Sequence, residues 1–132
     1  MRIDHIAVYV LDLEKSKEYF EEYFSGKSND LYHNPKTGLK TYFLSFKSGC
    51  RLEIMTKPGI TIVDNSKENM GYLHLAFSME DRGSVDALTD RIRKDGYAVL
   101  SEPRITGDGY YESCVSDPDG NRVEILVPIH TE

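Results

Sequence analysis

The stretch Ser116-Asp117-Pro118-Asp119-Gly120-Asn121-Arg122-Val123-Glu124-Ile125 combines a turn with a strand that carries a single glutamate. The Pro and Gly within residues 117–120 are typical of a tight connection, so this segment is predicted to join two strands as a hairpin. The strand after it is predicted over residues 122–127. Because neighbouring side chains of a strand point to opposite faces, Glu124 is predicted to lie on the face opposite Val123 and Ile125.

The first half of the chain carries the same arrangement. Glu53 interrupts the apolar run Leu52-Glu53-Ile54-Met55, as Glu124 interrupts its own strand. Each glutamate follows a strand-like run with one histidine: His5 in Ile3-Asp4-His5-Ile6-Ala7-Val8 and His74 in Leu73-His74-Leu75-Ala76-Phe77. The two histidine–glutamate separations are nearly equal. This pattern indicates one structural unit used twice.

Each half is predicted to fold as β-α-β-β-β. In the first half, Asp12 suits a helix start and Gly26 a helix stop, and residues 27–34 are ambiguous. In the second half, Val85, Leu88 and Ile92 fall at helical spacing before Gly96. The predicted strands are residues 2–10, 41–46 and 51–56 in the first half, and residues 72–78, 97–100, 110–115 and 122–127 in the second. Together they predict an α+β fold in one compact domain, with modules at 1–57 and 71–128 and a polar connection at 58–70.

Composition narrows the class of protein. The 132 residues include 16 Lys and Arg against 22 Asp and Glu, a formal charge of −6, which argues against binding to nucleic acid or to anionic membranes. No apolar run approaches the roughly 20 residues of a membrane helix, and no secretory signal is recognisable, so a cytoplasmic location is expected. The two cysteines, Cys50 and Cys114, are predicted to be inert, partly buried thiols.

The two histidines and two glutamates form a candidate metal site. Alternation places each of them opposite the aliphatic stripe that a helix is expected to cover. If the two sheets enclose a cleft, His5, Glu53, His74 and Glu124 converge, and imidazole with carboxylate ligands suits a divalent Zn, Ni, Fe, Co or Mn ion. His33 and His130 lie outside this symmetry and are predicted to be surface residues.

With these motifs the sequence resembles the vicinal oxygen chelate superfamily, which includes glyoxalase I, extradiol dioxygenases, epimerases, thiol transferases and bleomycin-binding proteins. The segments that carry the resemblance are Asp4-His5-Ile6-Ala7-Val8, the helix start at residues 12–16, Leu52-Glu53-Ile54, His74-Leu75-Ala76-Phe77 and residues 116–125. The resemblance implies an open barrel of two mixed sheets with the helices outside. It also implies the His, Glu, His, Glu ligand set of glyoxalase I.

The resemblance further implies a reaction. The substrate would be the hemithioacetal of a 2-oxoaldehyde such as methylglyoxal, isomerised to a 2-hydroxyacyl thioester. Glu124 is the expected base, Glu53 is its symmetric partner, and both histidines stay as ligands. A homodimer is expected because sites in similar enzymes often form between two chains.

Two positions depart from bacterial glyoxalase I, where an arginine follows the first His by four residues and an asparagine follows the first Glu by four. Here these positions are Tyr9 and Lys57, so a thiol other than glutathione remains open. An epimerase, thiol transferase or dioxygenase reaction, or ligand binding without turnover, also remains open. The candidate residues of the substrate pocket are Tyr9, Tyr42, Met55, Lys57, Tyr110 and Tyr111.

Overall fold

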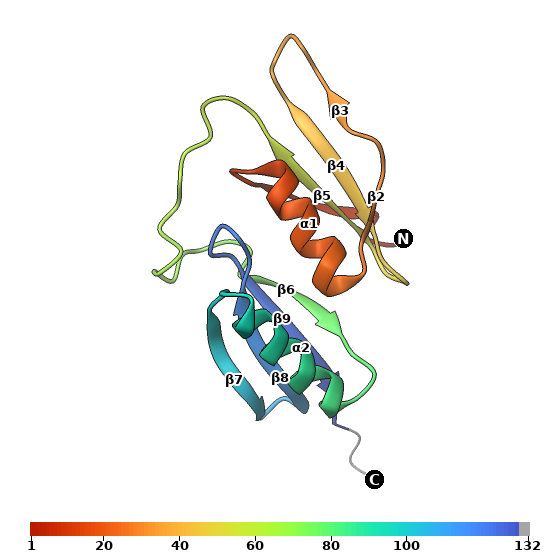
Figure 1. Ribbon diagram of the computed structural model, residues 1–132, viewed down its shortest axis with the longest axis vertical. Helices are drawn as coiled ribbons and strands as arrows, with labels where there is room; N and C mark the ends of the chain where they lie inside the picture. The colour runs from red at the N-terminus through yellow and green to blue at the C-terminus, as the bar shows by residue number, and fades with distance from the viewer. Residues whose placement is uncertain (130–132) are drawn as a thin grey trace. The chain divides into compact units, whose positions relative to one another are not determined.

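The computed structural model describes residues 1–129, which form two compact units, each with its own sheet and helix (Figure 1). The boundary falls between Val63 and Asp64, inside the polar connection predicted at residues 58–70. Over the described residues, no helix combines the length and apolar character needed to cross a membrane. His130 lies outside the described residues, and His33 is exposed as predicted.

The first unit is a mixed sheet with one helix. Its elements are β1 (His5–Tyr9), α1 (Leu13–Phe24), β2 (Lys27–Ser28), β3 (Tyr32–His33), β4 (Lys40–Ser45) and β5 (Arg51–Thr56). The strand order is β1-β5-β4-β2, with β3 also paired to β4; β1 runs parallel to β5 and the other pairs are antiparallel. The ambiguous residues 27–34 therefore form two very short strands on β4 where the repeat predicted one.

The second unit has the predicted β-α-β-β-β order. Its elements are β6 (His74–Ser78), α2 (Arg82–Lys94), β7 (Val99–Ile105), β8 (Tyr110–Ser116) and β9 (Arg122–Pro128). The strand order is β6-β9-β8-β7, with β6 parallel to β9 and the remaining pairs antiparallel. Two mixed sheets, each with one helix, confirm the predicted α+β class.

Helix α1 begins at the predicted cap. Asp12 has extended backbone, and its carboxylate accepts a hydrogen bond of 3.0 Å from the Lys15 amide, one of the amides left unpaired at a helix start. At the other end, Ser25 adopts the left-handed conformation with a φ of 55°. Gly26 follows it, and a Cβ there would lie 3.2 Å from the Phe20 carbonyl oxygen. The predicted stop at Gly26 is therefore made by Ser25, while Gly26 permits close packing.

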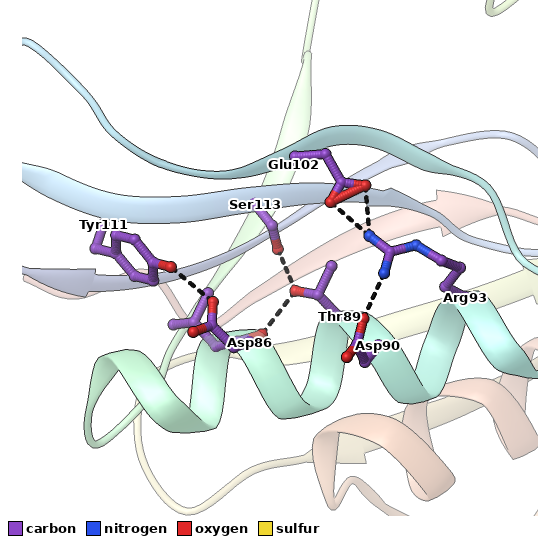
Figure 2. Close-up of polar contacts among 8 residues, drawn as sticks. Asp86, Thr89, Asp90, Arg93, Glu102, Tyr111 and Ser113 are labelled. Carbon is purple, nitrogen blue, oxygen red and sulfur yellow. Dashed lines mark hydrogen bonds and ion pairs between the residues drawn. The ribbon is translucent and has the colours of Figure 1, made fainter.

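Helix α2 is attached to its sheet by polar contacts as well as by apolar packing (Figure 2). Thr89 donates a hydrogen bond of 2.6 Å to the Val85 carbonyl, so its only hydroxyl hydrogen is used there. The Ser113 hydroxyl on β8 therefore donates the 2.7 Å bond that joins it to Thr89 Oγ1. Both side chains are almost fully buried. Nearer the end of α2, Arg93 pairs with Asp90 on the helix and with Glu102 on β7.

The hairpin turn is organised by one buried carboxylate. Asp117 is 5% exposed, and its Oδ1 accepts hydrogen bonds from the amides of Asp119 and Asn121 at 2.9 and 2.8 Å. Its Oδ2 accepts one from the Asn121 side chain at 3.0 Å. Gly120 has a φ of 84°, which favours glycine at this position. Burial nevertheless raises the pKa of Asp117, because loss of hydration outweighs the hydrogen bonds that favour the carboxylate.

Strand alternation separates a buried face from an open face in both sheets. Leu52 and Ile54 of β5, and Val123 and Ile125 of β9, are buried on the side that the helix of each unit covers. His5 of β1 and His74 of β6 occupy exposed positions, while Glu53 and Glu124 are partly exposed. The predicted division between the aliphatic face and the polar face is confirmed in each unit.

Candidate functional site

His5 and Glu53 lie on one face of two neighbouring strands in the first unit. In the parallel pairing of β1 with β5, His5 is opposite Arg51 and Ala7 is opposite Glu53. Glu53 is thus two residues beyond the partner of His5, and residues two apart on a strand share a face. Over residues 1–129 the Glu53 carboxylate has no hydrogen bond or ion pair, so its oxygens are available to a ligand.

The His5 ring is held by a small network of side chains. Its Nδ1 donates to Asp4 Oδ2 at 2.9 Å, and the Arg51 guanidinium donates to the same oxygen at 2.9 Å. Arg51 also lies 4.3 Å from the centre of the Phe43 ring, which meets His5 edge-to-face at 5.2 Å. The hydrogen bond at Nδ1 leaves the lone pair of a neutral imidazole on Nε2, the arrangement that suits a metal ligand.

Asp4 is ionised in this network. Hydrogen bonds from His5 and Arg51 lower the pKa of Asp4 from 3.8 to about 2, because both donors stabilise the carboxylate. A charged acceptor beside Nδ1 keeps the proton on that nitrogen. Sequence reasoning missed Asp4 and Arg51, although the Asp4-His5 adjacency was visible in the sequence.

The second unit repeats the register of the first. In the parallel pairing of β6 with β9, His74 is opposite Arg122 and Ala76 is opposite Glu124. Glu124 is again two residues beyond the partner of the histidine. Here the two side chains meet directly, with His74 Nδ1 3.3 Å from Glu124 Oε1. Each unit therefore places one predicted histidine and one predicted glutamate on the same face of two paired strands, and in the second unit their side chains are also in contact.

A cavity of about 580 Å³ opens beside His74 and Glu124 in the second unit. Its other lining residues include Arg104, Glu112, Cys114 and Arg122, together with three serines, Ser66, Ser101 and Ser116. Cys114 is directly opposite Glu124 across β8 and β9, and Glu112 lies two residues from Cys114 on the same face. Sequence analysis did not identify Arg104 or Glu112 as candidate site residues. The pairing of β7 with β8 brings them to the cavity, and neither residue belongs to a recognisable motif.

Two lining groups of this cavity have raised pKa values. Burial raises the pKa of Glu112, and the nearby Glu124 carboxylate raises it further. Burial also raises the pKa of the half-buried Cys114 thiol, which outweighs the opposing effect of Arg122. A raised thiol pKa suppresses the reactive thiolate. Cys50 and Cys114 are both free and partly buried, which confirms the expectation for these thiols as far as burial goes.

The pocket candidates of the first unit divide between the two faces of the sheet. Tyr9 and Met55 are paired in register and share the faces of His5 and Glu53. The Lys57 ammonium lies 5.6 Å from the centre of the Tyr9 ring. Tyr42 instead points to the helix, is 7% exposed, and donates a 2.6 Å hydrogen bond to Glu14. Tyr42 is a core residue of this unit and does not share the face of Glu53.

The tyrosines of β8 divide in the same way. Tyr110 shares the face of Glu112 and Cys114, because it precedes Glu112 by two residues. Tyr111 points toward the helix, where its hydroxyl donates a 2.7 Å hydrogen bond to Asp86 of α2 (Figure 2). Only Tyr110 of this pair therefore lies on the side that carries Glu124.

Neither unit, over the described residues, gathers three His, Cys, Asp or Glu side chains around a common metal position. Each unit supplies one imidazole and one carboxylate on its open face. The chemistry of the donors fits a divalent transition metal, because His5 presents a free Nε2 and Glu53 a free carboxylate.

The fold agrees with the comparison to known proteins. The chain belongs to the Glyoxalase/Bleomycin resistance protein/Dioxygenase superfamily, whose family pattern it matches over residues 2–125. This match confirms the resemblance inferred from the Asp-Pro-Asp-Gly turn and the paired His and Glu strands.

Curated relatives share a quarter or more of their residues with the chain. Protein YqjT of Bacillus subtilis is 28% identical, over 94% of this chain and 97% of the relative. A lactoylglutathione lyase of Haemophilus influenzae is 25% identical, over 96% of this chain and 92% of the relative. A lactoylglutathione lyase of Arabidopsis thaliana is 29% identical, but this chain spans only 44% of that protein.

Solved structures show the same fold. A trypanothione-dependent glyoxalase I from Leishmania major has a TM-score of 0.77 at 27% identity, covering 96% of this chain and 86% of that one. A glyoxylase/bleomycin resistance protein/dioxygenase domain from Frankia has a TM-score of 0.81 at 20% identity, covering 97% and 98% of the two chains. The second similarity concerns the fold alone.

Proposed function

We propose that this protein is a metal-dependent lyase of the glyoxalase I type. Its substrate is the hemithioacetal that a 2-oxoaldehyde such as methylglyoxal forms with a thiol, and its product is the 2-hydroxyacyl thioester. The observation that carries the proposal is the identical register of the two pairs, with Glu53 and Glu124 each two residues beyond the strand partner of a histidine. The similarity to two lactoylglutathione lyases supports it.

In this proposal His5, Glu53, His74 and Glu124 hold one divalent ion, of Ni, Zn, Co, Mn or Fe. Two neutral imidazoles and two carboxylates neutralise its charge, and four protein ligands leave positions for the substrate in an octahedral shell. Such an ion supplies Lewis acidity toward the substrate oxygens. Asp4 contributes by holding the His5 ring with Nε2 free.

Glu124 is the proposed base. It removes the proton from the carbon that bears sulfur and delivers it to the neighbouring carbon, so that the aldehyde-derived carbon becomes the thioester carbonyl. The Glu124 side chain is 19% exposed and borders the cavity, where a substrate carbon can reach it. Glu53 is the symmetric carboxylate, able to act on the other face of the substrate. The reaction is an isomerisation and needs no further reactant.

The proposal includes a small-molecule substrate, a cytoplasmic location and a homodimer. The dimer offers one way to combine the first unit of one chain with the second unit of another. Two copies related by a two-fold axis would then carry two equivalent sites.

Elemental analysis of the purified protein beside its Glu124→Gln variant tests the proposal first. Both proteins are then reconstituted with Ni, Co, Zn or Mn and assayed with methylglyoxal and a thiol. Stoichiometric metal with turnover that the variant loses would support the glyoxalase reaction. Metal without turnover by the unaltered protein would redirect the search to another reaction of the superfamily. Absence of bound metal after reconstitution would refute the four-ligand site.

A further inference from the structure

Arg51 and Arg122 occupy equivalent positions in the two units. Arg51 is the strand partner of His5, and Arg122 is the strand partner of His74. The Arg51 guanidinium is committed within the protein, because it donates to Asp4 at 2.9 Å and stacks over Phe43. It therefore has a structural role beside His5.

Arg122 has neither of these partners. The residue before His74 is Leu73, where Asp4 precedes His5, and Cys114 stands opposite Glu124 where Phe43 stands opposite Glu53. Over residues 1–129, no hydrogen bond or ion pair engages the Arg122 guanidinium.

The charges around the cavity leave Arg122 unbalanced. Arg104 is the strand partner of Glu112 across β7 and β8, and it lowers the Glu112 pKa by its charge. Glu124 lies beside His74 and is committed to the metal in the proposed function. One positive charge thus remains on a side chain that lines a cavity of about 580 Å³.

We propose that Arg122 binds a carboxylate on the thiol portion of the substrate, so that the preferred thiols carry a short acidic arm. This inference rests on the proposed function. Guanidinium binds a planar carboxylate through two parallel hydrogen bonds. A single unpaired arginine matches the one charge of a carboxylate better than the two charges of a phosphate. Ser116, the strand partner of Arg122 on β8, lines the same cavity, and its hydroxyl donates to the Asp117 carbonyl at 2.8 Å.

The strand geometry keeps Arg122 close to both candidate ligands of the second unit. Neighbouring strands lie about 5 Å apart, so the backbone of Arg122 is one strand spacing from that of its partner His74. Glu124 is two residues along the same strand, a separation of about 7 Å. A short linker of two or three carbons between the carboxylate and the sulfur suits a binding group this near in the sheet. A thiol such as 3-mercaptopropionate meets this requirement.

The test compares two thiols of equal length, 3-mercaptopropionate and 3-mercapto-1-propanol, as methylglyoxal hemithioacetals. Unaltered protein, Arg122→Gln and Arg82→Gln are assayed with both, the last as a control on helix α2. We expect the unaltered protein to favour the acidic thiol in kcat/KM by about 10- to 100-fold, through a lower KM. Arg122→Gln should lose this preference, so that its kcat/KM values for the two substrates become similar, while Arg82→Gln should keep the preference. An equal preference in the unaltered protein and Arg122→Gln would overturn the assignment.

A binding experiment separates this inference from the proposed reaction. The unreactive thioether 3-(methylthio)propionate is added to the protein while the Nε–H signals of arginine are followed by NMR, with 3-(methylthio)-1-propanol as the neutral control. A saturable shift of the Arg122 signal with the acid alone would support the carboxylate site, even if neither hemithioacetal is turned over. Equal shifts with both compounds, or no shift with either, would refute it.

Discussion

The Asp4 carboxylate and the His5 imidazole are joined by a 2.9 Å hydrogen bond, from His5 Nδ1 to Asp4 Oδ2. The equivalent histidine of the second unit, His74, has its Nδ1 beside Glu124 at 3.3 Å and follows Leu73 in sequence. The two histidines therefore occupy the same position in the repeat, but the side chains next to their Nδ1 atoms differ. His5 is oriented by Asp4, a residue outside the candidate ligand set, whereas His74 contacts another candidate ligand directly.

Replacing Asp4 with Ala is expected to weaken metal binding. Without its acceptor, Nδ1 of His5 no longer holds the proton preferentially, and the ring loses its fixed orientation. Loss of such a supporting partner typically lowers metal affinity by about 10- to 100-fold. Calorimetric titration with Zn or Ni measures the affinity, and ¹⁵N NMR of the metal-free protein reports the His5 tautomer.

Asp30→Ala is the matched control for Asp4→Ala, because Asp30 is an exposed carboxylate of the same unit. Unchanged tautomer populations and metal affinity in Asp4→Ala would show that the hydrogen bond does not orient His5.

A mixture of Glu53→Gln and Glu124→Gln chains tests whether the proposed sites combine units of two copies. In a mixed dimer with sites shared between chains, one site contains both altered glutamates and the other contains neither. Random exchange puts half of the chains in mixed dimers with one intact site each, so about a quarter of normal activity should return. The measurement is activity after joint refolding, with each variant refolded alone as the control.

Activity that stays at the level of the single variants would place each site within one chain. Size-exclusion chromatography with light scattering on the same samples establishes whether mixed dimers are available to form. A monomer by this measurement would contradict the expected homodimer.

Thr89→Val is expected to destabilise the second unit more than Ser113→Ala. The valine leaves the buried Ser113 hydroxyl without its acceptor, and an unsatisfied buried hydroxyl costs about 1–3 kcal/mol. Ser113→Ala leaves Thr89 bonded to the Val85 carbonyl at 2.6 Å, so fewer groups lose a partner. Urea denaturation gives the free energy of unfolding of each variant and of the double variant.

The double variant should lose less free energy of unfolding than the two single variants lose in total. With both hydroxyls removed, neither position keeps a buried hydroxyl that lacks a hydrogen-bond partner. Strict additivity would show that the 2.7 Å contact between Thr89 and Ser113 contributes no coupling energy.

Ser16→Ala is expected to leave stability unchanged or to increase it by up to about 1 kcal/mol. Ser16 of α1 is 1% exposed, and its hydroxyl has no hydrogen-bond partner over the described residues. Removing an unsatisfied polar atom recovers its desolvation cost and deletes little packing. Urea denaturation measures the change, with the exposed Ser48→Ala as control. A clear loss of stability would reveal a partner for the hydroxyl, such as a buried water.

Asp117→Asn is expected to change the pH dependence of stability. Burial raises the folded-state pKa of Asp117 above 3.8, so the folded protein binds a proton there more strongly than the unfolded chain does. This contribution is fully present below the unfolded value and is lost as pH rises through the folded pKa. The unaltered protein should therefore lose stability relative to Asp117→Asn over that window, and the difference should be constant at higher pH.

Urea denaturation at a series of pH values measures this difference, with Asp30→Asn as the exposed control. A difference of the opposite sign, with the unaltered protein gaining stability over the same window, would mean that the hydrogen bonds from Asp119 and Asn121 outweigh burial.

The sequence by itself determined the repeat, the class of fold and the pairing of each histidine with a glutamate on one face. These features depend on local rules: alternation along a strand, helical spacing, and the caps and turns at Asp12 and within residues 117–120. Each rule acts over a few residues, so it can be recognised without knowledge of distant partners. The predicted end of the first helix at Gly26 was less accurate. Ser25 adopts the left-handed conformation there, and serine is not a residue type from which this conformation is expected.

Only the tertiary structure decided which side chains support the candidate site. Tyr42 and Tyr111 turned out to face the helices, and Glu112 and Arg104 to face the cavity, because strand register sets which residue stands opposite another. The bond between Arg51 and Asp4 joins residues 47 positions apart, and no local pattern reports it. Such pairing distinguishes Arg51, which is bonded to Asp4, from Arg122, which has no hydrogen bond or ion pair over residues 1–129. Motif spacing predicted the features that the two repeats share, whereas pairing between distant strands determined the contacts in which they differ.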